Sequence, residues 1–166
     1  MDKRVSSNKD LFIIFKLKKM KKILLAATLI VAITSAAFAD GKKADAKFLT
    51  DLKASLKSVN ESAWQTTAFY KKTSFSVNGK NVNAYLDAED GSLVGFAIPV
   101  DVASLPGGAT EDIAKKFEGW QITNAIMFIE PDGKIRYFAQ VNKGNKGLAL
   151  SVSQKGKANI YARMPQ

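Results

Sequence analysis

Short alternating runs joined by tight turns fill the sequence from residue 64 onward and constrain its fold more than any other feature. Asn78-Gly79 separates two such runs, and this dipeptide favours a type I′ hairpin because both central residues of that turn need a positive φ. Pro131-Asp132-Gly133 marks another tight turn between two runs. Consecutive strands with connections this short pair antiparallel. The sequence therefore predicts an antiparallel sheet.

Two helices and eight strands are expected in this arrangement. Apolar residues recur at spacings of three and four over 43–59 and, more briefly, over 110–117, which indicates one amphipathic helix in each segment. Thr110 is the expected N-cap of the second helix. Lys71-Lys72 is expected to be a turn between the first two strands. The predicted strands cover 64–70, 73–77, 81–86, 92–98, 121–130, 134–141, 147–153 and 157–163.

The order helix, tryptophan, four strands occurs twice, with Trp64 and Trp120 at the starts of equivalent strands. We therefore predict an α+β fold made of two tandem helix-plus-four-antiparallel-strand repeats, at about 43–98 and 109–163. Together they are expected to form one twisted antiparallel sheet with the helices on one face. The tryptophans are expected to pack beneath the helices rather than to anchor a ligand.

Residues 1–39 have the order of a secretion signal. Four lysines between residues 18 and 22 precede an apolar run over 23–33, and Ala37-Phe38-Ala39 follows. We expect cleavage between Ala39 and Asp40. The alternative is a membrane anchor, but the apolar run is shorter than the roughly 20 residues that span a bilayer. The mature domain, 40–166, is thus expected to be periplasmic or secreted, without stable membrane insertion.

A second complete signal begins at Met20, which is followed by two lysines and the apolar run. Residues 1–19 are then either an upstream extension from a misplaced start codon or an unusually long charged region. Both alternatives leave the same mature domain.

Composition excludes several functions. The formal charge is +10, but residues 40–166 hold 17 basic and 13 acidic residues, a net charge of only +4, so nucleic-acid binding is not expected. The chain has no Cys, and therefore no disulfide or lipid-anchored Cys. It also has no His, which removes the commonest general base and metal ligand.

No catalytic, metal-binding or cofactor-binding residue is predicted. Asp87, Glu89 and Asp90 beside Gly91 resemble a fragment of a calcium loop, but the alternating ligands and the closing Glu are missing. A solvated turn explains them better. Within the expected mature domain, 40–166, no Ser or Thr has a His or a Ser-x-x-Lys arrangement to activate it. We therefore expect that the protein is not an enzyme and has no cofactor.

The alternation of the strands predicts which residues share a face. One face should pack beneath the helices; it includes Val82, Ala84, Leu86, Ile135, Tyr137, Val141, Leu148, Leu150, Val152, Ile160 and Ala162. The opposite, open face should carry the candidate partner-binding residues Tyr85, Arg136, Phe138, Gln140, Tyr161 and Arg163. Aromatic residues and Arg are enriched in protein-binding hot spots. The alternative is a half-solvated sheet, on which such residues simply fit the pleated surface.

These patterns favour a non-enzymatic exported binding module that uses the open face to bind a protein or peptide of the cell envelope. The rival hypothesis is a binder of acidic envelope polymers that uses the lysines near strand turns, which are Lys71, Lys72, Lys143, Lys146, Lys155 and Lys157. Salt distinguishes the two, because polymer binding weakens steeply with ionic strength and an apolar interface changes little.

Several motifs occur in an order typical of a known family. Residues 105–122, with Leu105-Pro106 and the run Lys116 to Ile122, are similar to a recurrent segment of the PepSY-like, β-lactamase-inhibitor-protein-like secreted proteins. The motifs at 75–80, 84–87 and 90–93 resemble that family too, so the resemblance covers roughly 45–163. It implies a twisted antiparallel sheet with helices on one face, no enzymatic activity, and a role in binding or inhibiting proteins outside the cytoplasm.

The chain departs from this family pattern at 59–64, which lacks the proline that usually precedes the tryptophan strand. This departure makes the end of the first helix its least defined boundary.

Overall fold

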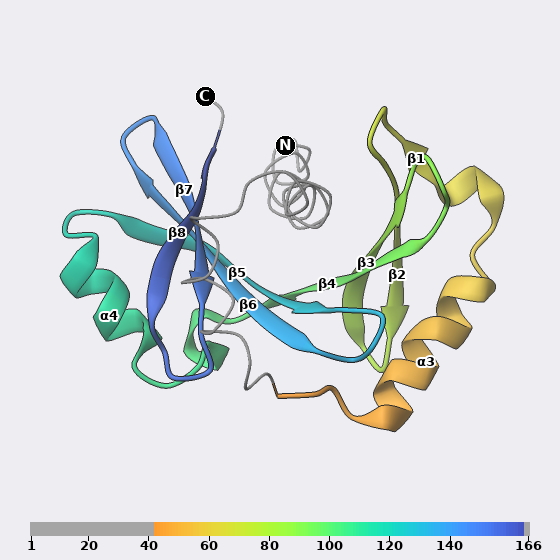
Figure 1. Cartoon of the computed structure of the whole chain (residues 1–166), viewed down its shortest axis with the longest axis horizontal. Helices are drawn as coiled ribbons and strands as arrows, with labels where there is room; N and C mark the ends of the chain where they lie inside the picture. The colour runs from red at the N-terminus through yellow and green to blue at the C-terminus, as the bar shows by residue number, and fades with distance from the viewer. Residues whose placement is uncertain (1–41, 165–166) are drawn as a thin grey trace, which may run out of the picture.

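The computed structural model describes residues 42–164, which form two α-helices and one open sheet of eight strands. This arrangement confirms the predicted α+β fold with an antiparallel sheet and two helices. Figure 1 shows the sheet curving between two arms, with one helix beside each arm. The elements are α3 (Ala46–Lys57), η2 (Glu61–Ala63), β1 (Gln65–Thr66), β2 (Tyr70–Val77), β3 (Lys80–Asp87), β4 (Leu93–Val100), η3 (Val102–Ser104), α4 (Ala109–Lys116), β5 (Gln121–Ile129), β6 (Ile135–Lys143), β7 (Lys146–Val152) and β8 (Ala158–Met164).

Each strand pairs with the next strand along the chain, so the sheet order is β1 to β8. The pairing continues across the middle of the molecule, where β4 and β5 are antiparallel from Phe96↔Ile129 to Val100↔Ala125. The connection between these two strands contains η3 and α4, yet its ends return to neighbouring positions. A single continuous sheet therefore runs through both halves of the chain.

Helix α3 begins where Asp45 caps it, because the Asp45 carboxylate accepts a hydrogen bond from the backbone N–H of Phe48 at 3.0 Å. This cap places the start three residues after the predicted one. Leu52 is fully buried, and it belongs to an apolar cluster with Val82 of β3 and Phe96 of β4. Burial of its apolar stripe thus holds α3 against the first half of the sheet.

Helix α4 starts earlier than predicted, after Gly108 rather than Thr110. Gly108 has φ 80°, and the Thr110 hydroxyl donates to Glu111 instead of capping the helix. Ile113 is 1% exposed and packs in a cluster with Leu148 and Leu150 of β7. This cluster attaches α4 to the second half of the sheet.

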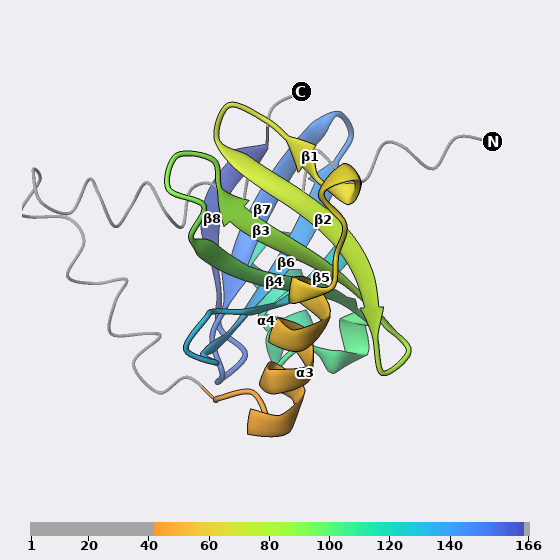
Figure 2. The ribbon, with the colours of Figure 1, turned by 90° about the vertical axis from the view of Figure 1, so that its right-hand side faces the viewer.

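The two helices lie on the same side of the sheet. Val100 and Tyr137 pack against both the α3 cluster and the α4 cluster, which places the clusters on one face. We call this face the outer face, and the face turned away from both helices the inner face. Figure 1 shows both helices outside the curve of the strands, and Figure 2, turned by 90°, shows α3 in front of the sheet.

The first hairpins differ from the predicted ones. Lys71-Lys72 is not a turn but lies within β2, where the two lysines pair with Leu86 and Tyr85. The turn comes earlier, because the Thr67 N–H donates to the Tyr70 carbonyl at 2.9 Å and its hydroxyl bonds the same residue. The Asn78-Gly79 hairpin is confirmed, with φ values of 51° and 74°.

Candidate functional site

Apolar side chains from β3 to β8 make a continuous cluster on the inner face. Its members are Tyr85, Ala97, Ile126, Phe128, Phe138, Ala149, Ala162 and Met164, each at most 7% exposed in the whole chain. Tyr70, Val94 and Tyr161 pack against it. Neither α3 nor α4 lies on this side of the sheet (Figures 1 and 2). The inner-face cluster is therefore a second apolar surface that the described helices do not cover.

The aromatic residues of the inner-face cluster contact one another edge to face. The Phe138 and Tyr161 rings are 5.1 Å apart at an interplanar angle of 68°, and the Tyr70 and Tyr85 rings are 6.0 Å apart at 64°. Such geometry is favourable because the positive edge of one ring meets the negative face of the other. Burial raises the pKa of Tyr161 well above its usual range, against a smaller lowering by the charge of Arg136.

Most predicted partner-binding residues lie where the alternation placed them. Tyr85, Phe138 and Tyr161 belong to or pack against the inner-face cluster. Gln140 pairs with Ala149, so it lies on the same face, and Arg136 pairs with Phe128. Tyr85, Phe138 and Gln140 are only 0%, 2% and 7% exposed, so these three are buried in the whole chain rather than half-solvated.

Arg163 is the exception, and the prediction that it shares the open face is wrong. A β-bulge shifts the register between Ala149 and Leu150, so that Leu150 pairs with Ile160 and Ala149 pairs with Ala162. The extra residue moves Ala162 into the inner-face cluster, which corrects its predicted place beneath the helices. Arg163 pairs with Leu148 of the α4 cluster and is exposed on the outer side.

The charge of Arg136 is balanced within the inner face. Its Nε lies 2.6 Å from Oε1 of Glu130, and the two side chains are 19% and 13% exposed. A charge held at this depth is stable only when it is paired. This part of the inner face therefore carries no net charge.

Alternation alone missed several members of the inner-face cluster, including Ala97, Ile126, Phe128, Ala149 and Met164. A usable signal was present in β5, where residues 125–129 are apolar at every position. A strand that is apolar at successive positions is buried on both faces.

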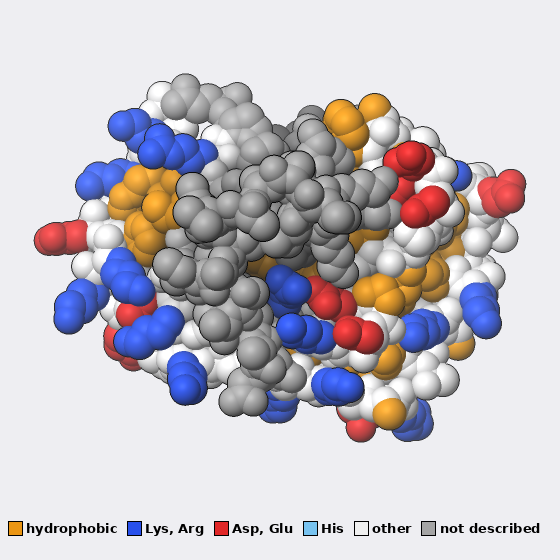
Figure 3. Space-filling model, viewed as in Figure 1, with side chains coloured by type: hydrophobic (Ala, Val, Ile, Leu, Met, Phe, Trp, Pro, Cys, Tyr) orange, Lys and Arg blue, Asp and Glu red, His pale blue; other side chains and the backbone are white. Residues whose placement is uncertain are grey.

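The six lysines of the rival hypothesis do not form one surface. Lys72 is 8% exposed and lies over the Tyr85 ring, 5.8 Å from its centroid. Lys157 pairs with Asp112 at 3.2 Å, and the Lys143 ammonium donates to the Glu118 carbonyl at 3.2 Å. Figure 3 shows Lys and Arg side chains spread across this view rather than gathered in one place.

The acidic residues Asp87, Glu89 and Asp90 at the β3–β4 connection form a hydrogen-bonded turn. One Asp87 carboxylate oxygen accepts hydrogen bonds from the backbone N–H groups of Glu89 and Asp90, at 2.7 and 3.2 Å. The Asp90 carboxylate accepts from the N–H of Ser92 at 2.8 Å. These bonds explain the residue types at this turn. Across residues 42–164, no three acidic side chains are grouped as metal ligands.

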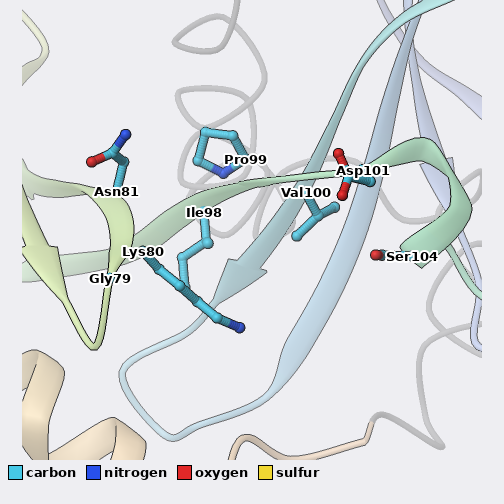
Figure 4. Close-up of a pocket in the computed structure, with 8 residues that line it drawn as sticks. All are labelled: Gly79, Lys80, Asn81, Ile98, Pro99, Val100, Asp101 and Ser104. Carbon is cyan, nitrogen blue, oxygen red and sulfur yellow. The ribbon is translucent and has the colours of Figure 1, made fainter.

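A pocket of about 440 Å³ opens where β3 and β4 diverge. Their pairing begins at Asn83↔Ala97, and Pro99, two residues further along β4, has no N–H to extend it. Lys80 and Asn81 enter from the hairpin, while Asp101 and Ser104 follow β4 (Figure 4). All four polar side chains are exposed, so the pocket does not hold them in a fixed geometry.

Within residues 42–164, neither helix has the length and apolarity needed to cross a membrane.

Several solved structures from Bacteroides share this fold. A DUF2874 family protein from Bacteroides uniformis ATCC 8492 is 17% identical over 69% of this chain and 86% of its own, with a TM-score of 0.51. A BLIP-like protein from Bacteroides fragilis NCTC 9343 is 14% identical over 75% and 88%, with a TM-score of 0.50. A structure described as "putative periplasmic proteins" from Bacteroides eggerthii DSM 20697 is 17% identical over 74% and 89%, with a TM-score of 0.51.

At these identities the likeness establishes the fold alone. The predicted resemblance to BLIP-like proteins agrees with it, whereas the relation to PepSY-like proteins stays a prediction. No protein-family model and no curated protein matches the sequence.

Proposed function

We propose that the chain is an exported, non-enzymatic module that binds a protein or peptide on its inner face. The observation that carries this proposal is the inner-face cluster, an apolar surface with aromatic members on the side of the sheet away from both helices. Protein-binding surfaces are built from such residues, with aromatic side chains as anchors. On this proposal the cell removes residues 1–39, and the mature domain, 40–166, presents the inner face to its partner.

The neighbours in fold support export and binding. One is described as "putative periplasmic proteins", which agrees with the predicted signal at residues 1–39, and another is described as BLIP-like, which agrees with a binding module. We also propose that the chain is related to the PepSY-like proteins and that its domain consists of two tandem repeats. The order of one helix followed by strands β1–β4, and then one helix followed by β5–β8, is compatible with such a duplication.

The test is a pull-down from envelope extract with protein expressed from the full-length sequence, recovered from the envelope fraction and washed at low and then high salt. We expect a discrete protein to remain bound at high salt. Phe138→Ala should reduce its retention, because Phe138 is a large aromatic member of the inner-face cluster. Tyr161→Ala is a second variant. Tyr161 lies on the edge strand β8, where truncating a side chain should disturb the fold less than at Phe138.

Matched controls come from the outer side of the same edge strand. Ile160 is 57% exposed and Arg163 is exposed, so Ile160→Ala and Arg163→Ala should leave retention unchanged. Equal retention by inner-face and outer-face variants that have the same melting temperature would refute the proposal. Capture of acidic polymers alone, lost at high salt, would instead support the rival hypothesis.

A further inference from the structure

Strand β8 is the long edge strand of the sheet. Among residues 42–164 it pairs with β7 alone and is seven residues long, whereas β1, at the other end of the sheet, has two residues. The backbone N–H and C=O groups along a sheet edge can pair with a strand of another molecule, and natural sheets usually protect them. The structure of β8 therefore bears on whether a second copy of this chain can add a strand there.

The pairing of β8 with β7 shows which backbone groups point away from the sheet. The Ser153 N–H donates to the Lys157 carbonyl at 2.9 Å, and bonded and non-bonded pairs alternate along an antiparallel ladder. Ala158 and Ile160 therefore belong to non-bonded pairs and turn their N–H and C=O groups outward. An added strand would have to bond to these groups.

An ion pair of α4 occupies both outward groups of Ala158. The Ala158 N–H donates to Oδ2 of Asp112 at 2.9 Å, and the Lys116 ammonium donates to the Ala158 carbonyl at 3.0 Å. The ammonium also lies 2.8 Å from Oδ2 of Asp112, so the two side chains bind each other as well as the strand. Together they offer one acceptor and one donor, as a residue of a neighbouring strand does.

Close packing holds α4 in this position beside β8 (Figure 1). A Cβ atom on Gly156, in the β7–β8 turn, would overlap the carbonyl oxygen of Gly107 and lie 2.8 Å from the nitrogen of Ala109, so this turn packs directly on the start of α4. The side chain of Asp112 is only 9% exposed. The ion pair is therefore a fixed part of the fold.

The bulge disturbs the rest of the β8 edge. Outward groups recur at every second residue of a regular strand, but the extra residue moves the next non-bonded pair after Ile160 to Arg163, which lies opposite Leu148. With Ala158 capped, no two outward positions within β8 are both uncapped and regularly spaced. A strand of another molecule could pair regularly at Ile160 alone.

We propose that Asp112 and Lys116 cap the β8 edge and, together with the bulge, prevent a second copy of this chain from adding a strand there. The cap restricts how the protein meets other proteins, because contacts must then be made by the faces of the sheet. This inference concerns a different surface from the inner face, so it does not depend on the proposed function.

The test compares molecular masses by gel filtration with light scattering, using protein expressed from the full-length sequence and recovered from the envelope fraction. Asp112→Ala combined with Lys116→Ala uncaps Ala158 next to Ile160. As the concentration rises, this double variant should shift from the mass of the wild type towards twice that mass. Lys157→Ala is the matched control: it removes the 3.2 Å pair with the same carboxylate, leaves both bonds to Ala158 in place, and should keep the wild-type mass.

Ile160→Pro separates strand pairing from association caused by unfolding. Proline removes the outward N–H of Ile160, so adding it to the double variant should restore the wild-type mass, although it cannot restore lost stability. Association that persists with the proline would refute the proposal. A double variant that keeps both the wild-type mass and the native near-ultraviolet circular dichroism would refute it too.

Hydrogen exchange tests the cap without any substitution and stays decisive if the double variant does not fold. In the wild type, the Ala158 amide should exchange at least about tenfold more slowly than the Ile160 amide, because the first is bonded to Asp112 and the second points outward. Equally fast exchange at both amides would refute the cap. Slow exchange at Ile160 would show that the edge is already paired, which would also overturn the proposal.

Discussion

The ring of Phe128 occupies the space that a side chain at Gly95 would need. A Cβ atom on Gly95 would lie 2.5 Å from Cζ of Phe128 and 2.6 Å from the carbonyl oxygen of Ile129. Gly95 also has φ +150°, which other residues rarely adopt. The Phe128 ring therefore packs directly on the backbone of β4 and forms part of the inner-face floor.

Gly95→Ala is expected to lower the free energy of unfolding by about 1–3 kcal/mol or more, because overpacking usually costs this much. Because the Phe128 ring must move, the variant should also weaken binding at the inner face. Urea unfolding measures the first effect. Gly91→Ala is the matched control: it has φ +68° but nothing within 4 Å of its Cβ, so it should lose only about 1–2 kcal/mol from backbone strain. Equal losses in the two variants would contradict the packing role of Phe128.

Asp112 makes stability depend on pH in the acidic range. Hydrogen bonds from the Lys116 ammonium and then from the Ala158 N–H lower the pKa of Asp112 from 3.8 to about 2. The unfolded chain therefore binds the proton more readily than the folded chain. The stabilisation is fully present above about pH 4 and is lost as the pH falls from there towards 2.

Asp112→Asn keeps an acceptor for the Ala158 N–H but removes the charge, so it should flatten the pH dependence between about pH 4 and 2 and cost about 1–2 kcal/mol at neutral pH. Urea midpoints across this pH range are the measurement. Glu111→Gln changes the charge of the exposed neighbouring residue and should shift stability by no more than about 0.5 kcal/mol. An unchanged profile in Asp112→Asn would show that another group governs the acid transition.

Leu52 carries the attachment of α3 to the sheet, since it is fully buried among Val82, Phe96 and other outer-face residues. Leu52→Ala should cost about 2–5 kcal/mol through lost burial and the cavity it leaves. The adjacent Lys53 is exposed, and Lys53→Ala should change the free energy of unfolding by no more than about 0.5 kcal/mol. A loss below about 1 kcal/mol in Leu52→Ala would mean that α3 adds little to the fold.

Binding at the β5–β8 part of the inner face should depend little on salt, because the Arg136–Glu130 pair leaves that part without net charge. We expect the dissociation constant of a protein or peptide retained by the inner face to change less than about threefold between low and high salt. Lys143→Gln with Lys146→Gln removes two exposed cations of the β6–β7 hairpin and should leave the affinity unchanged. A steep loss with salt, deepened by this double variant, would favour the polymer-binding hypothesis.

Local signals in the sequence were enough for the parts of the fold that depend on neighbouring residues. Asn78-Gly79 indicated its hairpin because both residues need a positive φ, and Asp87 indicated its turn because its carboxylate bonds the next N–H groups. Short connections determined antiparallel pairing, and the spacing of apolar residues around Leu52 determined α3. These features follow from the chemistry of a few successive residues.

Tertiary structure decided the rest. Lys72 entered β2 because the turn formed at Thr67 instead, and Arg163 moved to the outer face because β7 and β8 pair through a bulge. The meeting of β4 with β5, and of Gly95 with Phe128, joins segments about thirty residues apart. Alternation predicts which residues share a face only while the register is unbroken; a single extra residue opposite Ala149 reverses the faces that follow, and only pairing with the neighbouring strand reveals it.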